Sequence, residues 1–150
     1  MALAADLARA SHGGSNAIAA YLRTAAVTYY AGALVGLNPT TGALVLWSDT
    51  AGLLFKGLVE QHFPLSDFGI NTTAPNEVSV NESGPVLERV NVVGVASQAN
   101  VGDLVYATDD NTLTLTATVN VKAIGRISRW HTGVISDVKL FTPEEFFDQP

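Results

Sequence analysis

YYAGALVGLNPTTGALVLWSDTAGLLFKGLVE, residues 29–60, is the stretch that decides the fold. It holds three short apolar segments, separated by the turn-rich breaks NPTTG (residues 38–42) and SDTAG (residues 48–52). Apolar runs of this length, bounded by Gly, Pro, Asn and Asp, are typical of β-strands joined in hairpins. The stretch therefore predicts a series of short antiparallel strands.

The same arrangement returns later in the chain. GALV (residues 32–35) is matched by GDLV (residues 102–105), and in both cases a polar turn and an apolar-rich strand follow. Each series then reaches a strand with a central glycine, Gly57 in the first and Gly125 in the second. Glycine inside a strand marks a bulge, a corner or a close approach of backbones. Two such units predict a small closed or half-open barrel with pseudo-symmetric halves, although common hairpin patterns also produce matches of this kind.

Three further strands are predicted after the second glycine-led segment. TLTLTATV (residues 112–119) alternates strictly between apolar residues and threonines, which indicates a strand with one buried and one solvated face. Residues 121–130 and 134–141 predict two more strands, joined by a short hairpin loop at residues 131–133. The predicted fold class is all-β, a small β-barrel or β-tulip-like domain of short antiparallel strands.

The 150 residues fit one domain with appendages. We expect an extended N-terminal arm over residues 1–24, a β-rich domain over residues 25–141 and a short C-terminal tail over residues 142–150. Hydrophobic residues make up 47% of the chain, which is enough for a core, but only 15% of residues are charged. Soluble domains usually carry about 25% charged residues, so we expect part of the surface to be buried in an assembly.

Charge and composition exclude several classes of function. The net charge of −6 argues against nucleic acid and against an anionic membrane, because both are bound by cationic surfaces. The chain has no cysteine, which excludes disulfides, thiolate metal sites and cysteine nucleophiles. Its first residues lack the uninterrupted apolar core of a signal peptide, and no apolar run approaches the length of a membrane helix.

The residues that carry chemistry are scattered. The three histidines lie in separate segments without metal-ligand spacing, and no G-x-S-x-G, P-loop or G-x-G-x-x-G motif occurs. His62, near Glu60 and Asp67, is the best candidate for a metal or acid–base group, although a solvated loop histidine is the simpler interpretation. We therefore predict no catalytic residue, no cofactor and no metal site, and expect that the chain is not an enzyme.

One cluster combines basic and aromatic residues. Lys122, Arg126 and Trp130 share strand parity, so they are expected to line one face of their strand. Such a face either contacts an acidic partner surface or is simply the solvated side of a sheet.

Apolar residues at the ends and in one long loop are the candidate contact residues. Residues 2–10 are good helix formers with two leucines four positions apart, and they form either a frayed terminus or an arm that orders on a partner. The loop over residues 61–76 is too apolar to be freely solvated, and the tail opens with a helix-capping pattern before two phenylalanines. The predicted contact residues, which include a tyrosine pair with one member expected in the core, are Leu3, Leu7, Tyr29, Tyr30, Phe63, Phe68, Phe146 and Phe147.

Residues 28–60 and 99–127 resemble the two halves of small tailed-phage proteins known as capsid cement or head decoration proteins. The likeness is most distinctive at VGDLVYATDD (residues 101–110) and covers residues 27–140, but neither the start of the chain nor its Phe-Phe tail maps onto the family. The resemblance implies a β-rich, barrel-like subunit on the outer surface of the virion capsid, made in the host cytoplasm. Its implied partners are the major capsid protein and itself, as a homotrimer at local threefold positions.

In members of this family a flexible N-terminal arm often orders against the capsid, which would give residues 1–20 a role. Deleting those residues is then expected to leave a folded oligomer that binds heads more weakly. Two alternatives stay open: another virion β-module, such as a head-fibre or tail component, and a small ligand-binding β-barrel that uses the loop at residues 61–76.

Overall fold

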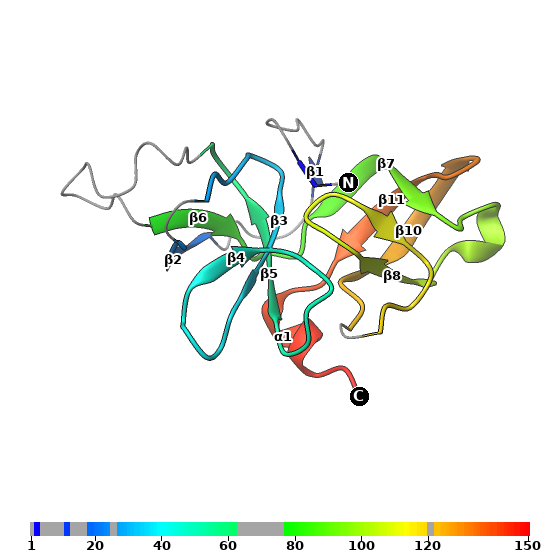
Figure 1. The fold of residues 1–150 in the computed structure, drawn as a ribbon. Helices are drawn as coiled ribbons and strands as arrows, with labels where there is room; N and C mark the ends of the chain where they lie inside the picture. The colour runs from blue at the N-terminus through cyan, green and yellow to red at the C-terminus, as the bar shows by residue number, and fades with distance from the viewer. Residues whose placement is uncertain (1, 4–10, 13–17, 25–26, 63–76, 120–121) are drawn as a thin grey trace.

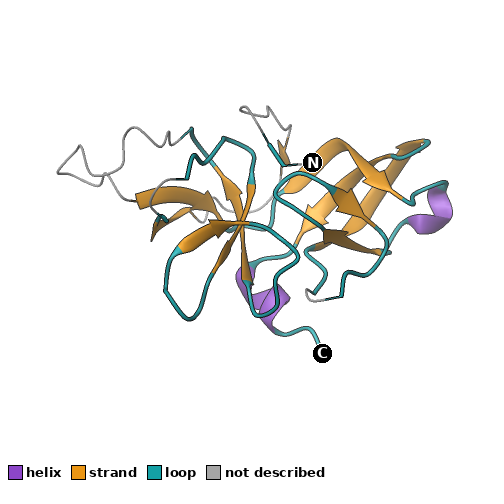
Figure 2. Cartoon of the chain, in the orientation of Figure 1, coloured by secondary structure: helices purple, strands orange, loops and turns teal. Residues whose placement is uncertain are grey.

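The computed structural model describes residues 2–3, 11–12, 18–24, 27–62, 77–119 and 122–150. Their regular structure is almost entirely β, with one short 3-10 helix and one short α-helix in the tail (Figures 1 and 2). The predicted all-β fold is confirmed. The elements are β1 Ser11–His12, β2 Ile18–Leu22, β3 Leu34–Leu37, β4 Leu44–Leu46, β5 Leu54–Val59, β6 Glu77–Asn81, β7 Val86–Val93, η2 Gln98–Asn100, β8 Leu104–Ala107, β9 Leu113–Thr114, β10 Gly125–Thr132, β11 Ile135–Leu140 and α1 Pro143–Phe147.

The strands form two units that lie side by side and have the same topology (Figure 1). The first unit has the strand order β2-β6-β5-β3-β4, and the second has the order β7-β11-β10-β8-β9, so each strand of the first corresponds to the strand five places later. Parallel pairing of β7 with β9 closes the second unit into a barrel. A single parallel bridge between Arg23 and Leu44 joins the two ends of the first unit in the same way. Each predicted half therefore forms its own unit and does not share one barrel with the other.

The two strand glycines occupy equivalent places. Gly57 of β5 pairs with Val35 of β3, and Gly125 of β10 pairs with Val105 of β8. Each glycine lies directly against the backbone of the next strand in its sheet, and a Cβ atom at either would approach a carbonyl oxygen closer than 3.0 Å. The predicted close approach of backbones is confirmed in both units.

The turns that lead into β3 and β8 also match. The Gly32 N–H donates to the Val59 carbonyl at 2.9 Å, and the Gly102 N–H donates to the Ile127 carbonyl at 2.8 Å. Both turn glycines have positive φ angles, 83° and 96°, which L-residues rarely adopt. The sequence repeat therefore corresponds to a repeat of hydrogen bonds and backbone conformation.

Two core clusters follow from this arrangement. The interior of the first unit is filled by Tyr29, Ala33, Val35, Leu44, Val59, Val78 and Val80. The larger cluster combines the interior of the second unit with the outer face of the first, so it joins the two units. Trp47 lies in this larger cluster, and its indole N–H donates across the junction to the Ala107 carbonyl at 3.0 Å.

The described part of the predicted arm is tied to the domain. β1 pairs antiparallel with the start of β7, and the Leu3 N–H donates to the Asp110 carboxylate at 3.1 Å. Ala2 and Leu3 are not helical, whereas the rest of the predicted helix at residues 2–10 lies outside the described residues. Residues 18–22, which the sequence assigns to the arm, form β2 and pair along β6. A deletion that tests the arm must therefore end before residue 18.

The predicted strand over residues 112–119 is wrong beyond Thr114, where β9 ends. The Thr114 hydroxyl accepts the Thr116 N–H at 3.1 Å, and this local bond takes a backbone donor away from any continuing ladder. Thr114, expected on the solvated face, is buried. Threonine side chains that bond their own backbone explain why strict alternation did not produce a long strand here.

Candidate functional site

The tyrosine pair divides as the sequence predicts, with one member in the core. Tyr29 is fully buried, and its hydroxyl donates to the Leu44 carbonyl at 2.5 Å while it accepts the Thr24 N–H at 3.1 Å. Burial raises the pKa of Tyr29, although the hydrogen bonds at Thr24 act in the opposite direction. Tyr29 thus holds the closing seam of the first unit and offers no surface to a partner. Tyr30 is half-buried and meets the His62 ring edge-on, with ring centroids 5.1 Å apart.

The two phenylalanines of the tail have opposite environments. Thr142 and Glu145 form the predicted capping box at the start of α1, with bonds of 3.2 and 2.8 Å. Phe146 is 3% exposed and packs against the rings of Trp47 and Phe55, whereas Phe147 is 70% exposed. Phe146 is therefore part of the larger core, and only Phe147 presents its ring to solvent.

The other predicted contact residues are described only in part. Leu3 is partly buried and packs against the interior cluster of the first unit. Leu7, Phe63 and Phe68 lie outside the described residues, as does the loop over residues 63–76. Their predicted contact role stays a prediction.

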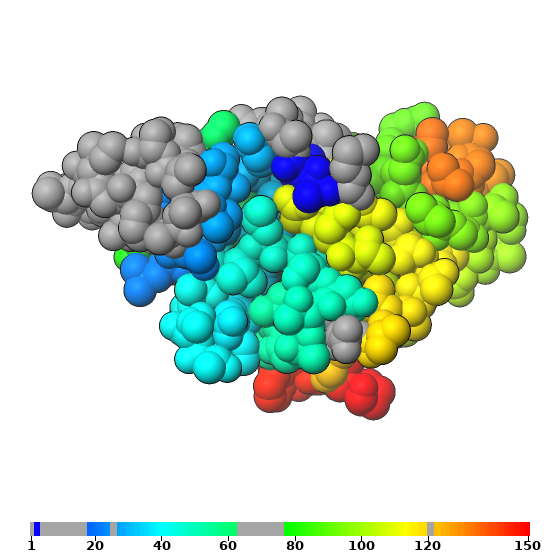
Figure 3. Space-filling model, in the orientation of Figure 1, coloured from blue at the N-terminus to red at the C-terminus, as the bar shows by residue number. Residues whose placement is uncertain are grey.

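β2 carries an apolar stripe that is exposed to solvent. The blue segment that includes β2 reaches the molecular surface in the space-filling view (Figure 3). Its burial alternates, so that Ile18, Ala20 and Leu22 face outward, and the two larger side chains are 54% and 61% exposed. Large apolar side chains this exposed on one short strand are a feature of interaction surfaces. The large hydrophobic residues that are exposed within the described ranges are Ile18, Leu22, Val93, Val101, Val119, Val134 and Phe147.

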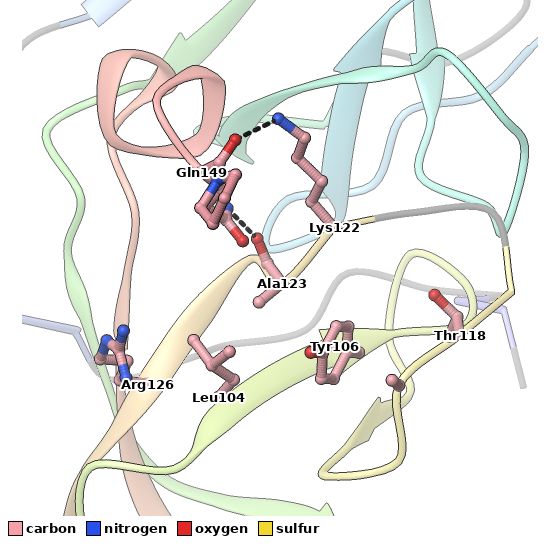
Figure 4. A pocket seen from close by; sticks show the side chains of 9 residues that line it. Leu104, Tyr106, Thr118, Lys122, Ala123, Arg126 and Gln149 are labelled. Carbon is pink, nitrogen blue, oxygen red and sulfur yellow. Dashed lines mark hydrogen bonds between the residues drawn. The ribbon is translucent and has the colours of Figure 1, made fainter.

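A pocket of about 400 Å³ lies outside the barrel of the second unit (Figure 4). Leu104 and Tyr106, on the outward face of β8, line it together with residues 117–118, the start of β10 and the end of the tail. Lys122 donates to the Gln149 carbonyl at 2.7 Å, and the Gln149 side-chain amide donates to the Ala123 carbonyl at 2.8 Å. These two bonds hold the tail across one side of the pocket. Of the loop over residues 61–76, expected to serve the ligand-binding alternative, the structure describes only Gln61 and His62, and neither lines this pocket.

The predicted basic-aromatic face on β10 is wrong. Ile127 pairs with Val138, but Arg129 pairs with Asp137, so one extra residue is inserted in β10 and the faces exchange beyond it. Arg126 remains on the outer face, where its guanidinium donates to the Gly102 carbonyl at 2.9 Å. Trp130 packs instead against the larger core cluster.

A histidine–aspartate pair on the β10–β11 hairpin was not predicted from sequence. His131 Nε2 lies 2.7 Å from Asp137 Oδ1, and the Arg89 N–H donates to the same oxygen at 2.8 Å. Asp137 lies opposite the inserted residue of β10 and opposite a similar irregularity in β7, where Arg89 has a φ of 53°. In the sequence, the only signal that could have indicated the pair is the separation of His131 and Asp137 by six residues across a short hairpin.

The pair makes stability depend on pH. Burial alone would raise the pKa of Asp137, but hydrogen bonds from Arg89 and His131 and the charges of His131 and Arg129 lower it below its ordinary value. A carboxyl with a lowered folded-state pKa stabilises the fold above its unfolded value, about 4, and loses that contribution as the pH falls through the folded value.

Asp137→Asn is expected to lower the free energy of unfolding by about 1–3 kcal/mol at pH 7, because the donors of Arg89 and His131 lose a charged acceptor. Below pH about 4 the difference from the wild type is expected to shrink. Urea unfolding at pH 7 and pH 3 measures both quantities, with Asp103→Asn, which removes an exposed carboxylate of the same unit, as the control. An unchanged difference at the two pH values would contradict this assignment.

The part of the chain that the structure describes contains neither a cluster of metal-ligating side chains nor a helix that could span a membrane. No group of three His, Asp or Glu side chains there is arranged to hold a metal ion. No helix among those residues is long and apolar enough to cross a membrane. Comparisons with protein-family models, with curated proteins and with solved structures find no significant match.

Proposed function

We propose that this chain is a non-enzymatic structural protein of a tailed-phage virion, which binds the outer surface of the mature capsid and stabilises it. The observation that carries the proposal is the coincidence of two patterns. The two stretches that resemble capsid decoration proteins are residues 28–60 and 99–127. The first contains β3–β5, and the second contains the equivalent β8, β9 and the start of β10. The likeness therefore extends over both halves of one repeated architecture.

The physical requirements of such a protein agree with its surface. A cement protein stabilises the shell by binding the mature lattice and not its separated subunits, so it needs contact surface and no chemistry. The chain has few charged residues and exposes large apolar side chains on β2 and in the tail. A homotrimer at local threefold positions would join three weak contacts through effective concentration.

The proposal is tested on expanded heads that lack the decoration protein. We expect the purified chain to bind them, to raise the temperature at which they disrupt, and to give trimeric density at local threefold positions in cryo-electron microscopy. Density elsewhere on the virion would favour the head-fibre or tail alternative, and no binding would refute the proposal. Light scattering of the free protein measures its oligomeric state, and a monomer both free and bound would refute the trimer.

The arm has its own variant in this experiment. Deleting residues 1–10 leaves β1 and β2 in place and, among the described residues, removes only Ala2 and Leu3. We expect a folded protein with weaker head binding.

A further inference from the structure

The repeat allows each residue of β2 to be matched with one of β7. A Cβ at Gly57 would meet the carbonyl of Asn81, and a Cβ at Gly125 would meet the carbonyl of Lys139, so Asn81 of β6 and Lys139 of β11 are equivalent. Gly57 and Gly125 occupy equivalent positions, and each lies against one of these two carbonyls. The two carbonyls therefore show which residue of the first unit corresponds to which residue of the second.

This register identifies the partners of the two strands. Ile18 of β2 pairs with Asn81, and Val86 of β7 pairs with Lys139, so Ile18 and Val86 are equivalent. The next residue of each strand agrees, since Ala19 pairs with the residue before Asn81 and Leu87 with the residue before Lys139. The start of β2 therefore corresponds to the start of β7.

The corresponding edges differ in what they pair with. On β7, the edge away from β11 receives β1, with His12 opposite Val86 and Ser11 opposite Leu87. On β2, the edge away from β6 pairs with no strand of the described residues before the bridge at Arg23. The fold thus has two equivalent edges that can accept a short antiparallel strand, and β1 fills one.

Within the described residues, the unfilled edge carries none of the sequence features that protect edge strands against pairing. Exposed edge strands commonly carry charges, proline or a bulge, each of which discourages the addition of another strand. β2 reads IAAYL, has no charge or proline, and pairs with β6 through five consecutive residues without a register shift. Its outward-facing residues are Ile18, Ala20 and Leu22.

We propose that the outer edge of β2 is a strand-addition site for an extended segment of a different protein, which under the proposed function is the major capsid protein. The segment runs antiparallel to β2, as β1 does on β7. It is uncharged, and its alternate residues are apolar so that they cover Ile18 and Leu22. Main-chain hydrogen bonds supply the affinity and these side chains the selectivity.

Two arguments favour a different protein over a second copy of this chain as the occupant. Each chain has two equivalent acceptor edges but only one β1, so exchange of β1 between copies leaves one edge per chain unfilled. Direct pairing of two β2 strands joins five residues of each copy, far short of the roughly 1,000 Å² that a stable interface requires. A short strand contact is sufficient, however, where other contacts already hold the subunit on a lattice.

The test places charges on the edge. Ile18→Lys/Leu22→Lys adds two charges at exposed positions of β2, and Val93→Lys/Val134→Lys adds two at exposed positions of the second unit as the matched control. We expect the β2 variant to bind expanded heads about tenfold more weakly than the wild type. Its oligomer mass in free solution and the midpoint temperature of its unfolding are expected to be unchanged. The control is expected to bind as the wild type does.

The outcomes separate this inference from the proposed function on which it rests. Failure of the wild type to bind heads overturns the proposed function. Equal binding to heads by the wild type and the β2 variant overturns the strand-addition site alone. A smaller oligomer mass of the free β2 variant would show that β2 joins copies of this chain, and it overturns the choice of a different protein as partner. If the variant does not fold, hydrogen exchange on the wild type decides: amides of residues 18–22 must exchange more slowly on heads than free in solution.

Discussion

Gly57→Ala and Gly125→Ala are each expected to abolish stable folding. An alanine Cβ at either position would lie closer than 3.0 Å to a backbone carbonyl oxygen of the neighbouring strand, and a backbone atom cannot move aside as a flexible side chain can. Relief requires separating β5 from β6, or β10 from β11, along the pairing that defines each unit. We expect a loss of more than about 4 kcal/mol, seen as insoluble expression or as loss of the cooperative transition in denaturant.

Two glycines of the turns provide the control. Gly102 and Gly133 have positive φ angles, but a Cβ at either meets nothing within 4 Å. Alanine there carries only the conformational penalty, about 1 kcal/mol, so both variants are expected to fold. The informative comparison is with Gly125, whose φ is not in the positive region, because its cost is purely steric. A Gly125→Ala protein as stable as the Gly102→Ala protein would refute the close approach.

Phe146→Ala is expected to destabilise the protein by about 3–5 kcal/mol, because it removes a buried ring and leaves a cavity beside Trp47 and Phe55. The tail helix is too short to persist without this anchor, so Gln149 is also expected to lose its hydrogen bond to the Ala123 carbonyl. Chemical denaturation measures the loss of stability.

The neighbouring residue is the matched control for this prediction. Phe147→Ala removes the same side chain from a position that is largely solvated, and we expect a change within about 0.5 kcal/mol. Equal effects of the two variants would show that the tail does not dock as described. An effect of Phe147→Ala on head binding alone would add the tail to the capsid-contact surface.

The repeat and the close backbone approaches at its strand glycines could be predicted because short stretches of sequence determine them. GALV and GDLV open equivalent strands, and Gly57 and Gly125 lie at equivalent close approaches. The capping box of the tail was equally local and is present. These features depend on turns, on backbone conformations and on spacing within about ten residues.

Predictions that required knowing which face a residue occupies were less successful. Strand parity placed Arg126 and Trp130 together, and one inserted residue in β10 separates them. Alternation predicted a strand through residue 119, but the Thr114 hydroxyl competes for the backbone after two residues. The pair of His131 and Asp137 was missed because two irregular strands are needed to bring it together.

The sequence by itself determined an all-β chain of short strands and indicated a repeat within it, because apolar runs bounded by turn formers constrain the backbone locally. Only the tertiary structure decided that Tyr29 and Phe146 are buried while Phe147 is not, since side-chain direction in strands and short helices depends on register and docking. It also decided that the edge of β7 is filled by β1 and that the described strands leave the equivalent edge of β2 unfilled. Pairing between strands distant in the chain sets these edges, and no local pattern encodes it.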